Sequence, residues 1–395
     1  MMARPPHRPA RRLHHYVVKA TWMLIACLVF AATYFLIHGP EGPQHWSSDL
    51  MIAYGAQQAE KQDDQIALIY VTDRTLKDSA STAPVDRELL ATVVDKAGKA
   101  GARVIGLDFV FDHVSNGSYD DKLAAAINAA PVPVVVGALD QRSAAAYDAK
   151  WQGDYFAKIK GKAKFAHLYF EDERHWLMNS DQVVRALPLS DGATPSFAEA
   201  LAAPDKPAAA APSALLAWLL PVPQIDWQRP PAGVDMFVTL SAEDVRDSDK
   251  PGTTLPLDTL LGGKRVIIGG DLSDRDQHLT PLSVKGPIYP GAWIHAQVLS
   301  QILHNRHLYA LTLPGEIAIG LICFALGGMI GSRQIAEHYH RLTELTCVAG
   351  LVLLTWLSFR YTHFLFPFSF AFVGGMIGIV TGHYFRLRER AYRLI

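Results

Sequence analysis

Four apolar runs, each long enough to cross a lipid bilayer, constrain this chain more than any other feature. One begins at Val17 and ends at Ile37, and three lie close together near the C-terminus. About 20 helical residues span the hydrocarbon core of a bilayer, which is roughly 30 Å thick. The sequence therefore predicts a multi-pass membrane protein with one N-terminal and three C-terminal transmembrane helices.

Arginines flank these spans on one side of the membrane. They lie before the first span, between the second and third, and after the fourth: Arg4, Arg8, Arg11, Arg12, Arg333, Arg341, Arg386, Arg388, Arg390 and Arg393. Because loops rich in Lys and Arg stay in the cytoplasm, these three segments are predicted to be cytoplasmic. Residues 38–312 are then extracytoplasmic, and there 34 acidic residues face 25 basic ones, as suits an exported soluble domain.

The predicted organisation divides the chain into eight segments. These are a basic cytoplasmic N-terminus (1–16), a first span (17–37), an extracytoplasmic domain (38–312), a second span (313–330), a cytoplasmic loop (331–341), a third span (342–359), a fourth span (364–383) and a cytoplasmic tail (384–395). The first apolar run is longer than a signal-peptide core, and the I-H-G-P-E that follows is a poor cleavage site. We therefore expect an uncleaved anchor.

Composition excludes several classes of function. The three cysteines, Cys27, Cys323 and Cys347, all lie inside predicted spans, so the exported domain has no thiol for redox or nucleophilic chemistry. The formal net charge of -1, without a basic patch, gives no reason to expect a nucleic-acid partner. G-x-S-x-G, G-x-G-x-x-G and phosphate-loop patterns are absent. We predict no enzyme activity, no catalytic residues and no cofactor.

The exported domain alternates short apolar runs with amphipathic ones. Strands are predicted at 66–72, 103–108, 132–137, 165–170, 182–187 and 264–270, and helices at 45–62, 85–100, 120–129 and 292–303. This alternation is typical of α/β units around a mixed, largely parallel sheet flanked by helices. The first of these helices is expected to lie near the membrane.

Carboxylates follow three of the predicted strands. Asp73, Asp108 and Asp271 lie at the carboxyl ends of strands, and Asp276 and His278 lie on a neighbouring loop. Ligands of open α/β sheets bind at that edge, so the five residues are candidates for binding a small polar or cationic ligand. The structural alternative is that they cap helices and fix turns.

A metal site is not predicted at these residues. The spacing around Asp271 lacks the D-x-D-x-D-G run and the distal Glu of a Ca²⁺ loop, and no H-E-x-x-H pattern occurs. None of the histidines lies in the middle of a span, where a haem ligand of a helix bundle is expected.

Glycines recur at four-residue spacing in two of the spans. They are Gly327 and Gly331 in the second span, and Gly374, Gly378 and Gly382 in the fourth. Small residues at this spacing let helices approach closely. They serve either packing within the chain or pairing with another subunit, and the spacing is compatible with both.

An ordered set of motifs resembles the type-two CHASE domain, an extracellular sensory module associated with cyclases and histidine kinases. Its A-G-A-K-x-I-G-x-D-x-x-F resembles 100–111, its D-x-x-x-T-P resembles 276–281, and its P-G-x-x-I-H-A resembles 290–296. Asp73 with Thr75, and Asp181 with Arg185, match two further motifs in part. The resemblance covers about residues 45–310, with the family's arrangement of one span before and three after.

The resemblance implies a membrane-anchored extracytoplasmic sensory or regulatory subunit for signal transduction. Family members usually carry a cytoplasmic output domain after the last span, whereas this sequence ends about a dozen residues beyond it. Action through a membrane-embedded or periplasmic protein partner is therefore expected, with a small-molecule ligand and homo-oligomerisation as further candidates. The alternative is a structural or assembly subunit that kept the sensory fold without ligand binding. We expect the protein in the bilayer of a bacterial inner membrane, with its large domain in the periplasm.

The predicted topology can be checked with reporter fusions. A reporter fused near Arg333 or after Arg393 is expected to behave as cytoplasmic, and one near Gly137 as exported, because of the asymmetric arginines. Reporter pairs active only in the cytoplasm or only outside it, fused at the same positions, provide the measurement. A cytoplasmic signal from the Gly137 fusion would overturn the scheme.

Overall fold

The structure is a computed structural model. It describes residues 43–77, 85–115, 117–138, 149–159, 163–170, 183–190, 194–206, 220–253, 255–273, 276–333 and 337–393. The predicted basic N-terminus (1–16) and first span (17–37) lie outside the described residues.

Six described strands form one sheet in the order β4-β3-β2-β7-β1-β6. They are β1 (Asp63–Thr72), β2 (Val104–Asp108), β3 (Val134–Ala138), β4 (Ala163–His167), β6 (Phe237–Ser241) and β7 (Arg265–Asp271). Each neighbouring pair is parallel. The predicted α/β fold with a largely parallel sheet is confirmed, although β6 was not predicted from the sequence.

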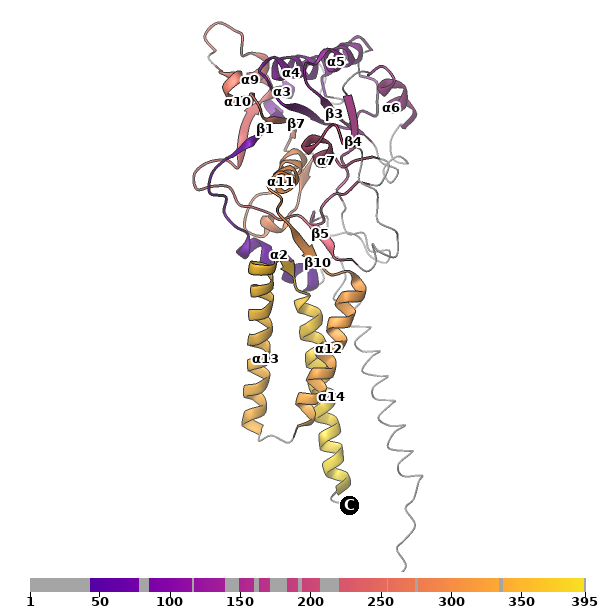
Figure 1. The fold of residues 1–395 in the computed structure, drawn as a ribbon, viewed down its shortest axis with the longest axis vertical. Helices are drawn as coiled ribbons and strands as arrows, with labels where there is room; N and C mark the ends of the chain where they lie inside the picture. Colours follow the sequence, from indigo (N-terminus) through magenta and orange to yellow (C-terminus); the bar gives the residue numbers. More distant parts are fainter. Residues whose placement is uncertain are drawn as a thin grey trace, which may run out of the picture.

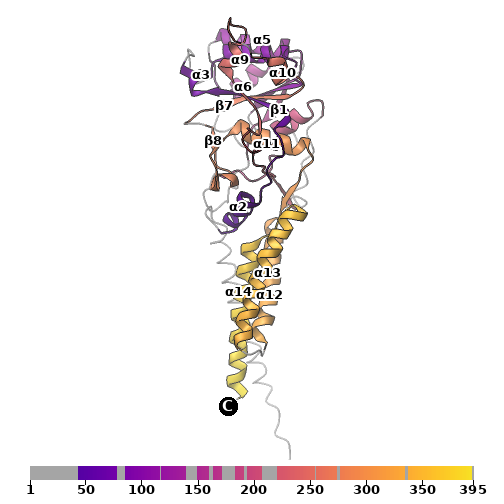
Figure 2. The same ribbon diagram turned by 90° about the vertical axis from the view of Figure 1, so that its left-hand side faces the viewer.

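Helices cover both faces of this sheet (Figure 2). The face away from the membrane helices carries α4 (Arg87–Lys99), α5 (Gly117–Ala129), α6 (Ala149–Phe156), α9 (Ala242–Arg246) and α10 (Leu257–Leu261). The opposite face carries α7 (Phe197–Ala202) and α11 (Gly291–Leu303). Alternate residues of each strand enter the two cores: Ile268 packs on the first face and Ile267 on the second. Burial on both faces explains why these strands read as continuous apolar runs.

Helix α4 shows how the local sequence sets an element. Asp86 caps its first turn by accepting hydrogen bonds from the backbone N–H groups of Glu88 and Leu89, at 2.8 and 3.3 Å. Leu90 and Val94, one turn apart, are fully buried against the sheet. The predicted helix 85–100 is therefore present, and its capping residue sets where it begins.

The strand predicted at 182–187 is wrong. In the described part, residues 183–190, Val183 forms one bridge to Leu279, and Ala186 forms another to Gln224. Because each residue pairs with a different segment, no continuous ladder forms. Two small sheets lie nearby: β5 (Val222–Gln224) with β10 (Leu308–Ala310) and β11 (Phe364–Leu365), and β8 (Gln277–His278) with β9 (Tyr289–Pro290).

Three described helices are long and apolar enough to cross a membrane: α12 (Leu313–Ser332), α13 (Glu337–Leu357) and α14 (Phe368–Arg393). They extend from one end of the α/β domain (Figure 1). Beyond α13 the chain makes a π-helical turn, η3 (Ser358–Thr362), before β11. Helix α14 stays helical to Arg393, so much of the predicted tail 384–395 continues the fourth span.

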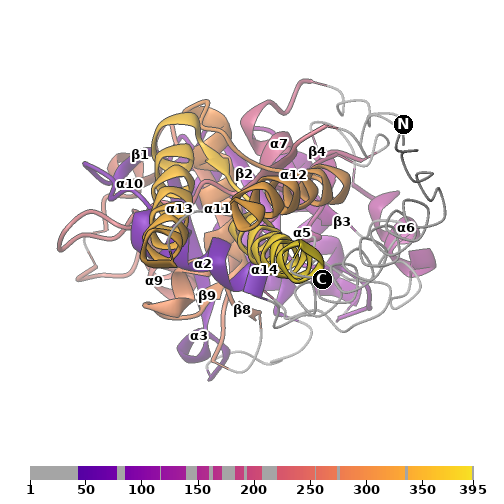
Figure 3. The ribbon, with the colours of Figure 1, turned by 90° about the horizontal axis from the view of Figure 1, so that it is seen from below.

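Helix α2 (Pro43–Gly55) lies between the α/β domain and the outer ends of these helices, near α13 and α14 (Figure 3). Its Ser47 lies within hydrogen-bonding distance of Ser369 in α14, at 3.3 Å between the two hydroxyl oxygens. Asp49 forms a buried bidentate ion pair with Arg185, both bonds at 2.8 Å. The helix is therefore attached both to the exported domain and to the membrane helices.

The glycine faces of α12 and α14 pack against each other within the chain. A Cβ at Gly327 would overlap the carbonyl oxygen of Gly375, and one at Gly378 would overlap that of Phe324. Three more glycines meet backbone of the opposite helix in the same way: Gly331, Gly374 and Gly382. These faces are therefore not free to pair with another subunit, which corrects the second use left open by their spacing.

Enlarging one of these glycines should loosen the membrane helices. Gly378→Leu is expected to lower the free energy of unfolding by about 2 kcal/mol or more, because overpacking separates the two backbones. Gly350→Leu on α13 is the control, since nothing lies within 4 Å of a Cβ there. The measurement is thermal unfolding of the detergent-solubilised protein, followed by far-UV circular dichroism. Equal melting temperatures for the two variants would contradict the described packing of α12 on α14.

Candidate ligand site at the carboxyl edge of the sheet

Strand β7 lies between β2 and β1, and this order brings the predicted site residues to one edge. In the paired register Thr72 lies opposite Asp271, and Asp108 lies opposite Gly269. Because all three strands are parallel, Asp73, Asp108 and Asp271 come at the carboxyl ends of adjacent strands. This is the edge at which open α/β sheets bind ligands.

Four residues gather on the α11 side of this edge: Asp108, Asp276, His278 and His295, called here the Asp–His group. His295 Nε2 lies 3.6 Å from Asp108 Oδ1, and His278 Nε2 lies 3.2 Å from Asp276 Oδ1. Phe170 joins the two histidines, stacking on His295 at 4.3 Å between ring centroids and meeting His278 edge-on at 5.4 Å. The four residues come from β2, from β8 and the residue before it, and from α11, whereas Phe170 comes from the segment after β4.

Two glycines make room for the carboxylates. A Cβ at Gly269 would lie 3.1 Å from Asp108 Oδ2, and a Cβ at Gly291 would lie 2.7 Å from Asp276 Oδ1. Asp276 itself has a positive φ of 57°, an uncommon left-handed conformation for a residue with a side chain. Its carbonyl accepts a hydrogen bond from the backbone N–H of Gly291 at 3.1 Å, which ties the loop to the start of α11.

Burial controls the charge of this group. Burial, and then the nearby Asp276 carboxylate, raises the pKa of Asp108 well above its ordinary value. Burial, with smaller contributions from the neighbouring His167 and His278, lowers the pKa of His295 from 6.5 to about 3. Both shifts favour the uncharged forms. Asp108 as a neutral acid can donate a hydrogen bond, and neutral His295 can both donate and accept.

Two polar atoms of the group lack a hydrogen-bond partner among the described residues. Asp108 Oδ2 and His295 Nδ1 are both buried there without one. Buried polar groups are nearly always hydrogen-bonded, so these two atoms make the Asp–His group the candidate site at this edge. In the described part of the chain, no three His, Cys, Asp or Glu side chains are placed to hold one metal ion.

The other two predicted residues take structural positions. Asp73 begins the short helix α3 (Asp73–Lys77) and accepts a hydrogen bond from the backbone N–H of Ser273 at 3.3 Å. Asp271 accepts one from Gln277 Nε2 at 3.1 Å. Both carboxylates are exposed. The structure thus groups three of the five candidates, Asp108, Asp276 and His278, and places Asp73 and Asp271 as braces of the loop after β7.

Sequence reasoning did not select His295, Phe170 or Tyr70 as site residues. His295 was visible within the P-G-A-W-I-H-A motif, where an unpaired polar residue interrupts an apolar helix. Tyr70 lies in β1, and burial, followed by the charge of Asp271, raises the pKa of its phenol well above 10.0. Phe170 follows a strand and carried no signal that separates it from core aromatics.

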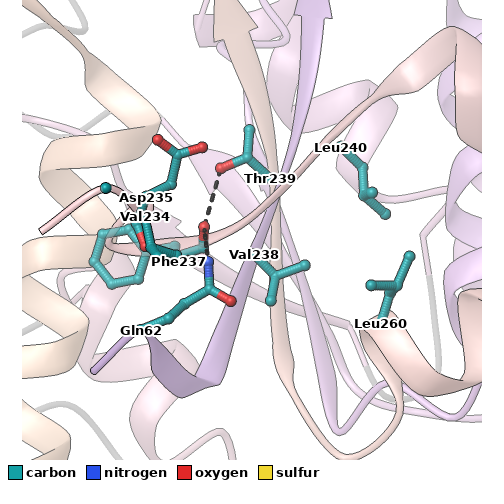
Figure 4. Close-up of a pocket in the computed structure, with 9 residues that line it drawn as sticks. Gln62, Val234, Asp235, Phe237, Val238, Thr239, Leu240 and Leu260 are labelled. Carbon is teal, nitrogen blue, oxygen red and sulfur yellow. Dashed lines mark hydrogen bonds between the residues drawn. The ribbon is translucent and has the colours of Figure 1, made fainter. Parts of the chain in front are cut away.

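A cavity of about 630 Å³ lies elsewhere, along the outer edge of β6 (Figure 4). Gln62 lines this cavity, and its Nε2 donates a hydrogen bond to the carbonyl of Phe237 at 3.2 Å. Asp235 is the one charged residue among those that line it. The cavity is therefore separate from the Asp–His group.

Comparison with known proteins identifies one family. The model of the CHASE2 domain family matches residues 23–330, which is most of the chain. No curated protein and no solved structure matches this sequence.

The histidine of this site predicts a pH-dependent stability. His295 has a lower pKa in the folded state than in the unfolded state, so below pH 6.5 the unfolded state binds a proton that the folded state does not. The free energy of unfolding is therefore highest above pH 6.5 and decreases as the pH falls toward 3. Between pH 7.5 and 4.5 the wild-type protein should lose about 2–3 kcal/mol more free energy of unfolding than His295→Gln. Urea unfolding in detergent, followed by the fluorescence of the domain's tryptophans, measures this. If the free energy of unfolding had the same pH dependence in both proteins, protonation of His295 would not be the cause of the loss.

Proposed function

The chain belongs to the CHASE2 domain family, and on that premise we propose that it is a sensory subunit of a bacterial inner-membrane assembly that signals through a partner protein. CHASE2 domains are extracellular sensory domains, and the three apolar helices support a membrane protein with an extracytoplasmic domain. The periplasm as the location of that domain, and the partner, belong to the proposal.

The observation that carries the sensory proposal is the Asp–His group with its two unpartnered buried atoms. Asp108 and His295 are held uncharged by burial, so the group favours a small polar ligand recognised by hydrogen bonds over one recognised by a full charge. Asp276 and His278 lie at the mouth of the group, each about a third exposed. A ligand entering there would meet these two side chains first.

A contiguous set of contacts leads from this group to the membrane. Asp276 and His278 precede a short 3₁₀ helix, η2 (Pro281–Val284), which packs against α2. Lys285 then places its ammonium 3.1 Å from the ring centroid of Tyr54 in α2. A ligand that shifts the loop would therefore act directly on α2, and through it on α14.

Helix α2 is also connected to the site through the segment that contains Val183 and Arg185. Arg185, which pairs with Asp49 in α2, lies two residues after Val183, whose bridge partner Leu279 follows His278. The buried pair leaves little freedom between α2 and this segment, because separating it would strand two charges. Movement of the loop at Leu279 would therefore reach α2 by both routes.

The proposed partner needs a surface other than the glycine faces. The inner half of α13 offers such a surface, because its large apolar side chains Leu342 and Leu345 are exposed. α12 and α14 bury their glycine faces against each other, whereas α13 packs much less closely on α14 and diverges from the pair (Figures 1 and 3). A membrane-embedded partner, or a second copy of this chain, would pack on the inner half of α13, away from its outer end.

One observation favours the alternative of a structural subunit. Asp108 is 9% exposed and His295 is 1% exposed, so the centre of the group is covered in this conformation. A scaffold that kept the sensory fold without ligand binding would show the same covered group. Enzyme activity is not part of the proposal, since none of the four residues is paired with a nucleophile.

Cross-linking from α13 tests the partner. A photoreactive residue in place of Leu345, 68% exposed, is expected to link the protein to a second polypeptide of constant mass in its native membrane. The same residue in place of Phe370, 1% exposed, is the control and should give no such product. A lone monomer after gentle extraction, with no cross-link from position 345, would end the proposal.

A second variant separates the sensor from the scaffold. With the photoreactive residue at 345, His278→Ala should change the yield of the cross-linked product by about threefold or more if the Asp–His group controls the partner contact. Asp244→Ala in α9, on the far face of the sheet, is the matched control. Equal yields from both variants would favour the scaffold.

A further inference from the structure

A second cavity, of about 610 Å³, lies where the exported domain meets the membrane helices. Helix α2 and the outer ends of α13 and α14 enclose it. Its lining side chains include Trp46, Met51 and Tyr54 from α2, Val352 and Trp356 from α13, and Phe366. Its volume falls within the roughly 300–1,000 Å³ of small-molecule sites.

The lining of this cavity is apolar and aromatic. Tryptophan and tyrosine favour the boundary between hydrocarbon and water, where a ring can be buried while its polar atom stays hydrated. Trp46, Tyr54 and Trp356 are 63%, 62% and 45% exposed, which is unusual for large aromatic side chains of a water-soluble surface. Their position at the outer ends of two spans identifies this boundary.

The cavity adjoins an exposed apolar surface of the span α13. Val352 lines it, and the neighbouring Leu353 and Leu354 are 55% and 49% exposed on the span α13. In a bilayer such a surface is covered by acyl chains, so lipid is the molecule present there at the highest concentration. Lys285 supplies a cation at the rim, 3.1 Å from the ring centroid of the lining residue Tyr54.

We propose that this cavity binds one phospholipid of the outer leaflet, with an acyl chain between α2 and α13 and the phosphate near Lys285. The apolar lining matches the chain, and the charge of Lys285 is complementary to the phosphate. Because α2 also contacts η2 and the loop that carries Asp276, the bound lipid stabilises one position of the helix that joins the Asp–His group to the membrane. The site is independent of the proposed function and stands without a partner protein.

Two adjacent substitutions on α13 test the site. Val352→Trp fills the cavity, whereas Leu353→Trp adds the same side chain at an exposed position that does not line it. Native mass spectrometry of the full-length protein, released from detergent after repeated washing, counts the retained phospholipids. The wild type and Leu353→Trp should each retain one, and Val352→Trp should retain about tenfold less. Equal retention by the two variants would overturn the proposal.

A measurement on the unaltered protein guards against misfolding of the variants. The protein is reconstituted in vesicles of phosphatidylglycerol and phosphatidylethanolamine that contain a trace of a phospholipid with a diazirine in its acyl chain, and is then irradiated. Saturable labelling within 46–55 and 352–368 is expected. Labelling spread evenly along α12, α13 and α14, or cross-links that place residues 17–37 in the cavity, would refute a specific lipid site. Neither result bears on the partner cross-link from position 345.

Discussion

The pairing of β7 between β1 and β2 is the interaction on which the rest of this structure depends. It joins a strand at residues 265–271 to strands formed some 160 to 200 residues earlier, with register partners such as Leu68 and Gly106 for Ile267. Because β7 runs parallel to both, it ends at the same edge of the sheet as β2, which ends in Asp108. The segment after β7 therefore begins at this edge and leads to α11 on one face of the sheet. Without this insertion Asp108 and His295 would not face each other.

The same pairing decides the chemistry of the site by burying it. His295 lies on α11, pressed against the sheet between Phe170 and Phe197, so it is held uncharged at neutral pH. Asp108 is driven toward the neutral acid by the same burial. Asp108 Oδ2 and His295 Nδ1 have no hydrogen-bond partner among the described residues, so the proposed ligand would meet neutral hydrogen-bonding groups rather than a full charge.

Helix α2 connects the exported domain to the membrane helices. It is tied to the exported domain by the buried Asp49–Arg185 pair and touches α14 through Ser47 and Ser369. Contacts from η2 and Lys285, which follow the Asp–His group, and the lining of the proposed lipid site both involve this one helix. In the proposed function, a ligand signal and the state of the bilayer would therefore act on the same short element.

The sequence by itself determined the elements whose signal is local. Apolar length identified the three described spans, continuous apolar runs identified five of the six strands of the main sheet, and the amphipathic pattern over 85–100 identified α4. Tertiary structure decided the rest, because it depends on contacts between distant residues. β6 (Phe237–Ser241) is a half-exposed edge strand without a strong apolar run. The four-residue spacing of the glycines around Gly327 in α12 and Gly378 in α14 was compatible with packing within the chain or with another subunit. The tertiary structure shows these glycines packed against the opposite helix. Asp73 and Asp108 follow strands in the same way, and only the position of α11 made one a buried acid and left the other an exposed brace.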